Sequence, residues 1–101
     1  MQDTYRPLPK GLKIKDSEVH GQGVFTEVSL EKDWVLGPAY LIYEGKKIRL
    51  PIGGFINHSD TPNVEKKEHL RDPFKVQEII TVREISAGEE LTINYNDERY
   101  E

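Results

Sequence analysis

Short β-type segments, each ended by a turn signal, are the feature that most limits the folds open to this chain. Alternating or β-branched residues recur, but no such segment exceeds about ten residues, and helical periodicity is poor throughout. The predicted strand segments are residues 11–15, 24–26, 34–36, 41–43, 47–50, 75–84 and 91–95. The chain therefore predicts a mostly β domain.

Turn residues mark where these segments end. Gly45 is predicted in the turn of a hairpin formed by residues 41–50, and Gly37-Pro38 is predicted to end the segment before it. The charged residues 64–71 fit no element clearly. Trp34 and Phe25 are predicted to belong to the core.

The 101 residues fit one small domain with a modest core. Residues 1–10 are predicted to form an N-terminal extended arm, residues 11–97 the folded domain, and residues 98–101 a short C-terminal tail. Hydrophobic residues make up 36% of the chain and charged residues 32%, which is typical of a globular domain.

Charge and composition argue against several functional classes. The net charge is −4 with no dense cluster of Lys or Arg, so we expect no nucleic-acid partner. No apolar run approaches the roughly 18 residues that span a bilayer, and no signal peptide opens the chain, so we expect no membrane association. A cytoplasmic location is predicted. The chain has no cysteine, and its three histidines lack ligand-like spacing, so no metal site is predicted.

Residues 55–63, FINHSDTPN, are rich in hydrogen-bonding side chains. Gly53 and Gly54 precede them and Pro62 stiffens their far end, which favours a shaped turn. Asn57 can offer both a donor and an acceptor to a heterocycle edge. His58 suits an acid, a base or a ligand, or a histidine held in a turn by backbone bonds. By itself, this stretch is equally well interpreted as a turn that satisfies only its own hydrogen bonds.

Two further elements have both a functional and a structural interpretation. Gly21-x-Gly23 would let a ligand approach the backbone, but it is also a common hairpin turn. Residues 91–95 alternate, so Leu91, Ile93 and Tyr95 are predicted on one apolar face. Tyr95 is then either a core tyrosine with a bonded hydroxyl or a functional group.

Taken in order, residues 20–25 (HGQGVF), 55–63 and 85–95 (ISAGEELTINY) closely resemble the three signature motifs of SET-domain protein-lysine methyltransferases. The likeness covers residues 11–97, as a minimal SET domain, and is greatest to the compact viral and bacterial SET proteins. For a viral protein, it implies a host-intracellular location in place of a cytoplasmic one. It implies a β-clip-like fold of several small sheets with a pseudoknot-like threaded C-terminal segment.

The resemblance also implies S-adenosyl-L-methionine as cofactor and a lysine of a protein or peptide as substrate. Tyr95 matches the catalytic tyrosine beside the methyl-transfer path, where it would orient the reacting groups. The residues implied to bind the cofactor are Gly21, Gln22, Gly23, Asn57, His58 and Tyr95. Candidates for the substrate channel are Tyr43, Phe55 and Tyr100.

Three departures from the family pattern keep two functions open. Residues 37–54 are far shorter than the insert that builds the peptide groove of histone-directed members, the cysteine cluster is absent, and only six residues follow Tyr95. Tyr100 or a partner subunit would then have to close the lysine channel, so a homodimer is one predicted assembly. The first function is a protein-lysine N-methyltransferase that transfers methyl in line to a deprotonated amine. The alternative is a non-catalytic SET-like module that binds S-adenosylmethionine, a peptide or a partner protein.

Overall fold

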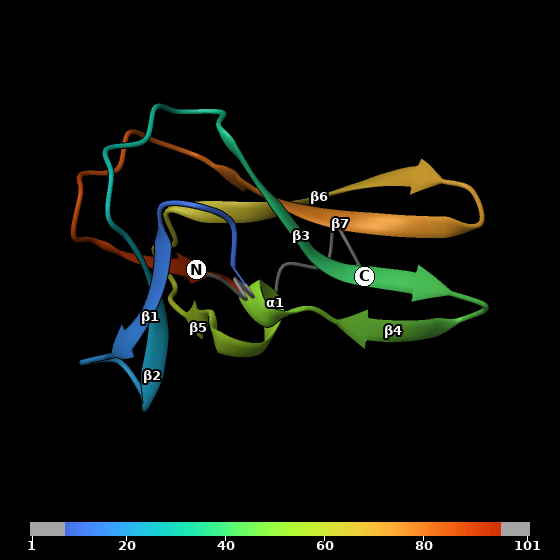
Figure 1. The fold of residues 1–101 in the computed structure, drawn as a ribbon, viewed down its shortest axis with the longest axis horizontal. Coiled ribbons are helices and arrows are strands. Elements are labelled where there is room, and N and C mark those ends of the chain that lie inside the picture. The colour runs from blue at the N-terminus through green and yellow to red at the C-terminus, as the bar shows by residue number, and fades with distance from the viewer. Residues whose placement is uncertain (1–7, 96–101) are drawn as a thin grey trace, which may run out of the picture.

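The computed structural model describes residues 8–95, which form eight strands and one short helix (Figure 1). The elements are β1 (Leu12–Asp16), β2 (Gln22–Thr26), β3 (Val35–Tyr43), β4 (Lys46–Arg49), α1 (Pro51–Phe55), β5 (Asn57–His58), β6 (Val64–Arg71), β7 (Phe74–Thr81) and β8 (Glu90–Ile93). The strands form two four-stranded sheets. The prediction of a mostly β domain with small sheets is confirmed.

The smaller sheet, in the order β1-β2-β8-β5, brings the three motif segments together. β1 and β2 pair antiparallel from Leu12↔Thr26 to Asp16↔Gln22. β8 pairs antiparallel with β2 on one side and parallel with β5 on the other. The strand that leads to Tyr95 thus lies between the glycine turn and the strand that carries Asn57. The threaded C-terminal segment stays a prediction.

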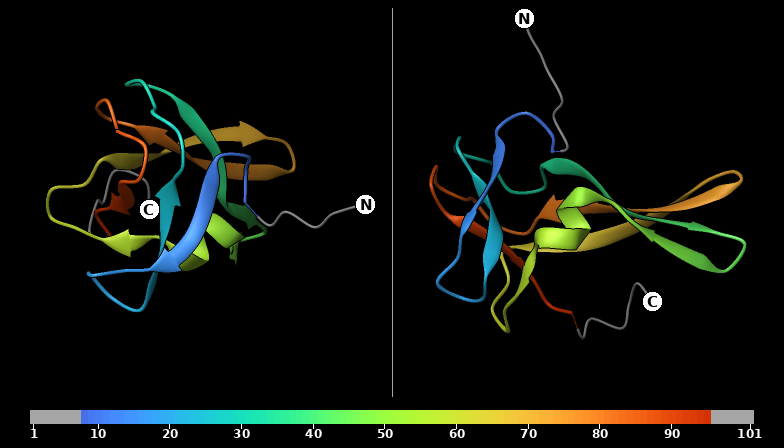
Figure 2. Two further views of the ribbon diagram at one scale, coloured as in Figure 1. Left: turned by 60° about the vertical axis from the view of Figure 1, so that its left-hand side comes forward. Right: turned by 60° about the horizontal axis from the view of Figure 1, so that its bottom comes forward.

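The larger sheet, in the order β4-β3-β7-β6, consists of two hairpins joined along β3 and β7. The β3–β4 turn is Glu44-Gly45, with φ angles of 49° and 77°, as a tight hairpin turn requires. This confirms the predicted hairpin with Gly45 in its turn. Figures 1 and 2 show the far ends of both hairpins projecting away from the smaller sheet.

β6 is a strand that the sequence did not identify. Its charged residues have weak strand preference, but β6 pairs with β7 along its whole length, from Val64↔Thr81 to Arg71↔Phe74. Val64 and Lys66 point inward and are buried. Cross-strand pairing therefore decides the conformation here.

The prediction that Gly37-Pro38 ends a strand is wrong. β3 continues through both residues, and its register against β7 shifts between Val35 and Gly37 and again between Pro38 and Tyr40. Bulges of this kind accommodate glycine and proline in a strand.

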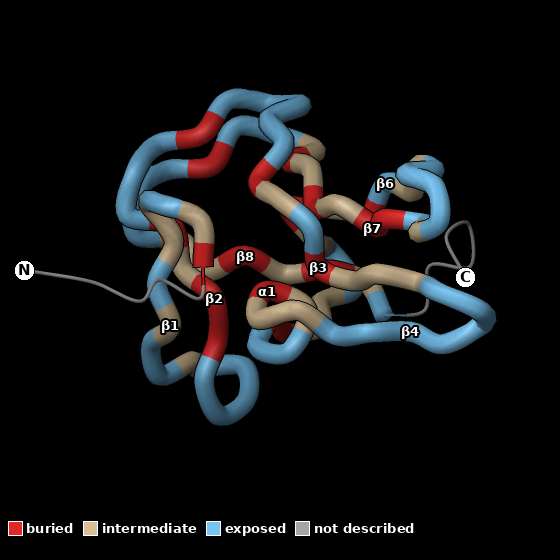
Figure 3. Tube along the Cα trace, turned by 45° about the vertical axis from the view of Figure 1, so that its right-hand side comes forward, coloured by how far each residue is buried: buried red, intermediate tan, exposed pale blue. Residues whose placement is uncertain are grey.

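Buried apolar side chains gather where β2, β8, α1, β3 and β7 meet, while the hairpin tips are exposed (Figure 3). The core residues are Leu8, Val24, Leu30, Leu36, Ala39, Ile52, Ile56, Val64, Ile79, Ile85, Leu91 and Ile93. Trp34 is not among them. Its side chain is 54% exposed, because the Trp34 backbone pairs with Thr81 and leaves the ring outside. Phe25 is half-buried.

The packed residues begin within the predicted arm, because Leu8 is only 8% exposed and belongs to the core. Residues 1–7 and 96–101, which include the predicted tail, lie outside the described residues. Within residues 8–95 no helix is long and apolar enough to cross a membrane.

Candidate active site

The helical turn α1 leads from the larger sheet to the motif strand β5. Pro51 begins this turn and Ile52 is buried beneath it. A Cβ on Gly53 would lie 2.5 Å from the Ala39 carbonyl oxygen and 2.7 Å from the Tyr40 ring. The Tyr40 hydroxyl donates to the Gly53 carbonyl at 3.2 Å. Glycine is therefore needed here for the close approach of Tyr40, and not for an unusual backbone angle.

Asn57, which is 8% exposed, is fixed through its amide nitrogen. Nδ2 lies 3.1 Å from the carbonyl oxygens of His20 and Gln22 and 2.8 Å from Glu90 Oε2. These contacts occupy the donor side of the amide, so Oδ1 is the atom left to accept a hydrogen bond from a ligand. The sequence suggested that Asn57 could both donate and accept. In the structure its donor group binds the carbonyl oxygens of the glycine turn.

Glu90 connects β8 to the glycine turn and to the loop before it. Ser17 Oγ donates to Glu90 Oε1 at 2.7 Å, while Asn57 donates to Oε2. A Cβ on Gly23 would overlap this carboxylate and lie 2.9 Å from Asn57 Nδ2. By contrast, Gly21 is exposed, has a φ of 47° and has open space around it. Gly21 thus serves the turn, and Gly23 makes room for Glu90.

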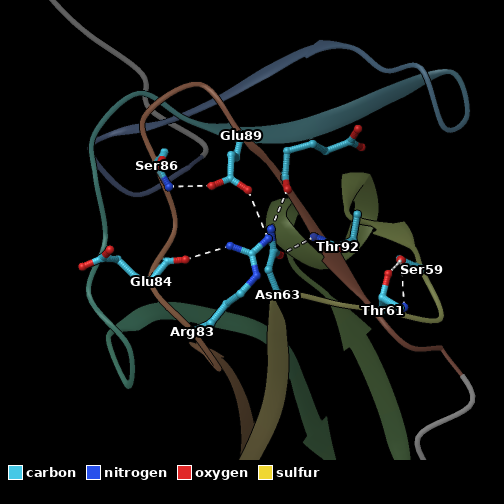
Figure 4. A network of polar contacts seen from close by, with 9 residues as sticks. Ser59, Thr61, Asn63, Arg83, Glu84, Ser86, Glu89 and Thr92 are labelled. Atoms are coloured by element: carbon cyan, nitrogen blue, oxygen red, sulfur yellow. Dashed lines mark hydrogen bonds and ion pairs between the residues drawn. The ribbon is translucent and has the colours of Figure 1, made fainter.

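A second polar network fixes the turn that precedes β8 (Figure 4). Glu89 accepts from the Ser86 N–H at 2.6 Å and from Arg83 at 3.1 Å. The Ser86 hydrogen bond, assisted by Arg83, holds the pKa of Glu89 below its usual range. Asn63 Oδ1 accepts from the Thr92 N–H at 2.8 Å. These bonds hold β8 in place against the segment that follows β5.

His58 positions the residue that follows β8. Its Nδ1 accepts from the Tyr95 N–H at 3.0 Å, so Nε2 carries the proton that contacts Asp60 Oδ1 at 3.0 Å. The His58 and Tyr95 rings lie 5.1 Å apart. Because both ring nitrogens make protein contacts, the geometry favours a histidine held in its turn over an acid, a base or a ligand.

The interpretation of Tyr95 as a core tyrosine is wrong. Leu91 and Ile93 are buried, but β8 ends at Ile93 and Tyr95 is 56% exposed. The Tyr95 hydroxyl donates to the Ile56 carbonyl oxygen. With its N–H bonded to His58, Tyr95 is tethered both at its backbone and at the tip of its ring.

Burial raises the pKa of both Tyr40 and Tyr95 above the ordinary phenol value of about 10, and the Arg49 guanidinium only partly opposes this. For Tyr40, the nearby Tyr95 adds to the increase. Both phenols are therefore protonated at neutral pH. They can donate hydrogen bonds, but they cannot act as general bases there.

Two cavities meet at Tyr95. The first, the motif cavity, has a volume of about 350 Å³ and is lined by His20, Gly21, Gln22, Gly54, Phe55, Ile56, Asn57 and Tyr95. The second, the basic cavity, measures about 380 Å³ and is lined by Tyr40, Arg49, Gly53, Gly54, Lys66, Ile93, Asn94 and Tyr95. Gly54 and Tyr95 line both. Each volume is within the range of small-molecule sites.

The motif cavity unites most of the predicted cofactor residues. Gly21, Gln22, Asn57 and Tyr95 line it directly. The two others make contacts behind its wall: Gly23 packs against the amide of Asn57, and His58 accepts the hydrogen bond from the Tyr95 backbone.

The three channel candidates do not lie together. Phe55 is 39% exposed and lines the motif cavity. Tyr43 lies at the end of β3, where its ring packs 5.2 Å from that of Phe74, and it lines neither cavity. Tyr100 is outside the described residues. The channel role of these residues stays a prediction.

Sequence reasoning missed Tyr40, Arg49 and Glu90. Glu90 lies inside the third motif, directly before the alternating residues 91–95. A carboxylate at the start of such a strand could have been recognised as a candidate site residue. No local pattern marks Tyr40 or Arg49, because they reach the site only through the pairing of β3 and β4.

The raised phenol pKa values predict a loss of stability at high pH. Because the folded pKa of Tyr40 exceeds the unfolded value, its contribution is complete below pH of about 10 and is lost as pH rises through the folded pKa. We expect the Tm, measured by circular dichroism from about pH 8 to about pH 11, to fall less steeply in Tyr40→Phe than in the parent. Tyr43→Phe should follow the parent. Parallel curves for Tyr40→Phe and the parent would contradict this assignment.

A match to a family model spans the whole region just described. The model of the SET domain matches residues 15–96, from within β1 to just past Tyr95. The chain belongs to the SET-domain family. The described residues that line the two cavities of this SET domain all lie inside the matched range.

Curated relatives and a solved structure agree with this assignment. H3 lysine-36-specific histone-lysine N-methyltransferases from Cryptococcus neoformans and Candida albicans are 43% identical over 49 residues and 46% identical over 50 residues. Each match covers 48% of this chain but only 6% of the relative. A Plasmodium falciparum crystal structure described as a candidate histone methyltransferase superposes with a TM-score of 0.76 at 23% identity. It covers 93% of this chain and 100% of that one, which shows a shared fold.

Proposed function

We propose that this SET domain is an S-adenosylmethionine-dependent protein-lysine N-methyltransferase. The observation that carries the proposal is that Gly54 and Tyr95 form a common wall between the motif cavity and the basic cavity. A cofactor and an amine that enter from separate cavities can be aligned at such a wall, and alignment can supply much of the acceleration of a displacement reaction. The lysine-methylating relatives support a lysine side chain as the acceptor.

The motif cavity fits the cofactor in size and in chemistry. Asn57 Oδ1 is an acceptor suited to an ammonium or amino group, and Phe55 offers an apolar face. Gly21, which has open space around it, leaves the backbone accessible. When bound, S-adenosylmethionine supplies a methyl group on a positively charged sulfur.

The acceptor amine must be neutral before it can form the new nitrogen–carbon bond. For a lysine with a pKa of about 10.4, deprotonation at pH 7 costs about 4–5 kcal/mol. Arg49 and Lys66 line the basic cavity and disfavour an added positive charge there, which favours the neutral amine. The proton leaves to water, because the raised pKa of Tyr95 makes this phenol a poor base.

Tyr95 is proposed to orient the reaction. Its hydroxyl is bonded to Ile56 and its backbone to His58, so the ring is held between the two cavities. We assign it the alignment and electrostatic support of the methyl group in transfer. The Ile56 carbonyl beside it belongs to the segment that presents Asn57, which couples cofactor and acceptor positions.

Calorimetric titration with S-adenosylmethionine and its demethylated product tests the cofactor site. We expect Asn57→Ala to weaken binding at least tenfold, because it removes Oδ1 and takes the amide donor away from the half-buried Glu90 carboxylate and from two carbonyls. Lys32→Ala, at an exposed position that lines neither cavity, is the control and should bind like the parent.

The outcomes separate the candidate functions. Failure of the parent to bind at millimolar cofactor would reject the methyltransferase function for this chain. Cofactor binding without transfer of a labelled methyl group to any lysine peptide would favour the non-catalytic module. The homodimer that would complete the channel stays a prediction, and sedimentation with and without cofactor tests it.

A further inference from the structure

Among residues 8–95, those that line the basic cavity include two cations and no carboxylate. Arg49 and Lys66 are the charged residues among those that line it. Arg49 ends β4, whose sequence Lys-Lys-Ile-Arg is exposed at every position. The chain as a whole has a net charge of −4, so this local excess of cations opposes the overall balance. Since charges are screened within about 8–10 Å in physiological salt, the local excess decides what the cavity attracts.

Tyr40 gathers these cations at the cavity. The Lys47 ammonium lies 4.3 Å from the centre of the Tyr40 ring and the Lys66 ammonium 5.6 Å from it. The Arg49 side chain passes close to Gly54, another residue that lines this cavity. A Cβ added to Gly54 would lie 3.5 Å from the Arg49 Cδ. Two ammonium groups, one from β4 and one from β6, therefore lie near one aromatic ring, and Arg49 lines the same cavity.

We propose that the basic cavity and β4 select target lysines that have acidic residues beside them in the substrate. The inference rests on the proposed methyltransferase function and concerns the substrate side of the same site. An arginine binds a carboxylate through paired, charge-assisted hydrogen bonds, and Arg49 lies at the cavity edge where a flanking carboxylate would arrive. A basic segment would meet like charges, and such a juxtaposition strongly disfavours binding.

Peptide binding tests the selection without requiring turnover. Three labelled peptides, each with one central lysine flanked by glutamate, glutamine or arginine, are titrated with the full chain and followed by fluorescence anisotropy. We expect the glutamate peptide to bind about tenfold more tightly than the arginine peptide at low salt, with the difference shrinking as salt rises.

Variants at position 49 test whether Arg49 is the cause of this preference for the acidic peptide. Arg49→Lys should keep it, whereas Arg49→Glu should abolish or reverse it. Lys32→Glu makes the same change in net charge at an exposed position outside the cavity and should keep the preference. Circular dichroism and cofactor calorimetry on each variant show that the fold and the motif cavity are intact.

Each result bears on the inference. Equal binding of the three peptides, or an acidic preference retained in Arg49→Glu, would overturn it. The inference would also be overturned if the Arg49→Glu variant lost cofactor affinity but kept the peptide preference. That result would indicate that Arg49 binds the carboxylate of the cofactor instead. Acid-selective peptide binding without any methyl transfer would leave the charge selection supported and reject the proposed function alone.

Discussion

Tyr95→Phe should slow methyl transfer roughly 100-fold while leaving cofactor affinity almost unchanged. The substitution removes the hydroxyl that donates to the Ile56 carbonyl, so the ring at the junction of the two cavities is no longer held at its tip. The His58 bond to the Tyr95 backbone remains, and the apolar part of the wall remains with it. The measurement is the single-turnover rate of methyl transfer at saturating cofactor.

Trp34→Phe provides the control, because Trp34 is an exposed aromatic residue that lines neither cavity. It should transfer methyl at the parental rate. If Tyr95→Phe were as fast as the parent, with unchanged cofactor binding, the orienting role of the hydroxyl would have to be abandoned.

Gly23→Ala should abolish cofactor binding and lower the stability of the domain by about 1–3 kcal/mol. The added methyl group would overlap the Glu90 carboxylate and crowd Asn57 Nδ2, so these hydrogen-bonded side chains would have to move from their present positions. Asn57, which lines the motif cavity, would then lose the orientation that these contacts fix. Calorimetry measures the affinity, and urea denaturation measures the free energy of unfolding.

Gly45→Ala separates the local effect from a general loss of stability. Gly45 has a φ of 77° and no neighbour within 4 Å of an added Cβ, so the variant is strained but distant from the cofactor site. It should lose stability and still bind cofactor. A Gly23→Ala protein that bound cofactor as well as Gly45→Ala would show that the packing of Gly23 against Glu90 is not needed.

The sequence predicted more of the site than of the fold around it. The three motifs contain Gly21, Gln22, Asn57 and Tyr95, and these four residues do line one cavity. Motifs of this kind can be recognised from the sequence because each is local, with turn residues and hydrogen-bonding groups at fixed spacing. The hairpin at Gly45 was legible for the same reason, since a two-residue turn depends on its own backbone angles.

Errors arose where distant segments decide the outcome. The charged residues 64–71 could not be assigned from the sequence, yet they pair with β7 along their full length. Trp34 looks like a core residue, but pairing of its backbone with Thr81 leaves the ring at the surface. Tyr95 alternates with Leu91 and Ile93, but the strand ends before it. Local patterns cannot report cross-strand partners or where a strand ends.

The sequence by itself determined the β class, the family and the identity of the motif residues, because turn chemistry and motif spacing are properties of neighbouring residues. Only the tertiary structure decided how those residues are used. In the tertiary structure the Asn57 amide nitrogen contacts the Glu90 carboxylate and two carbonyl oxygens, and Gly23 packs against the same carboxylate. The tertiary structure also brought Arg49 and Lys66, from β4 and β6, to the cavity beside Tyr95. Burial, close packing and charge depend on contacts between segments far apart in the chain, and folding alone creates those contacts.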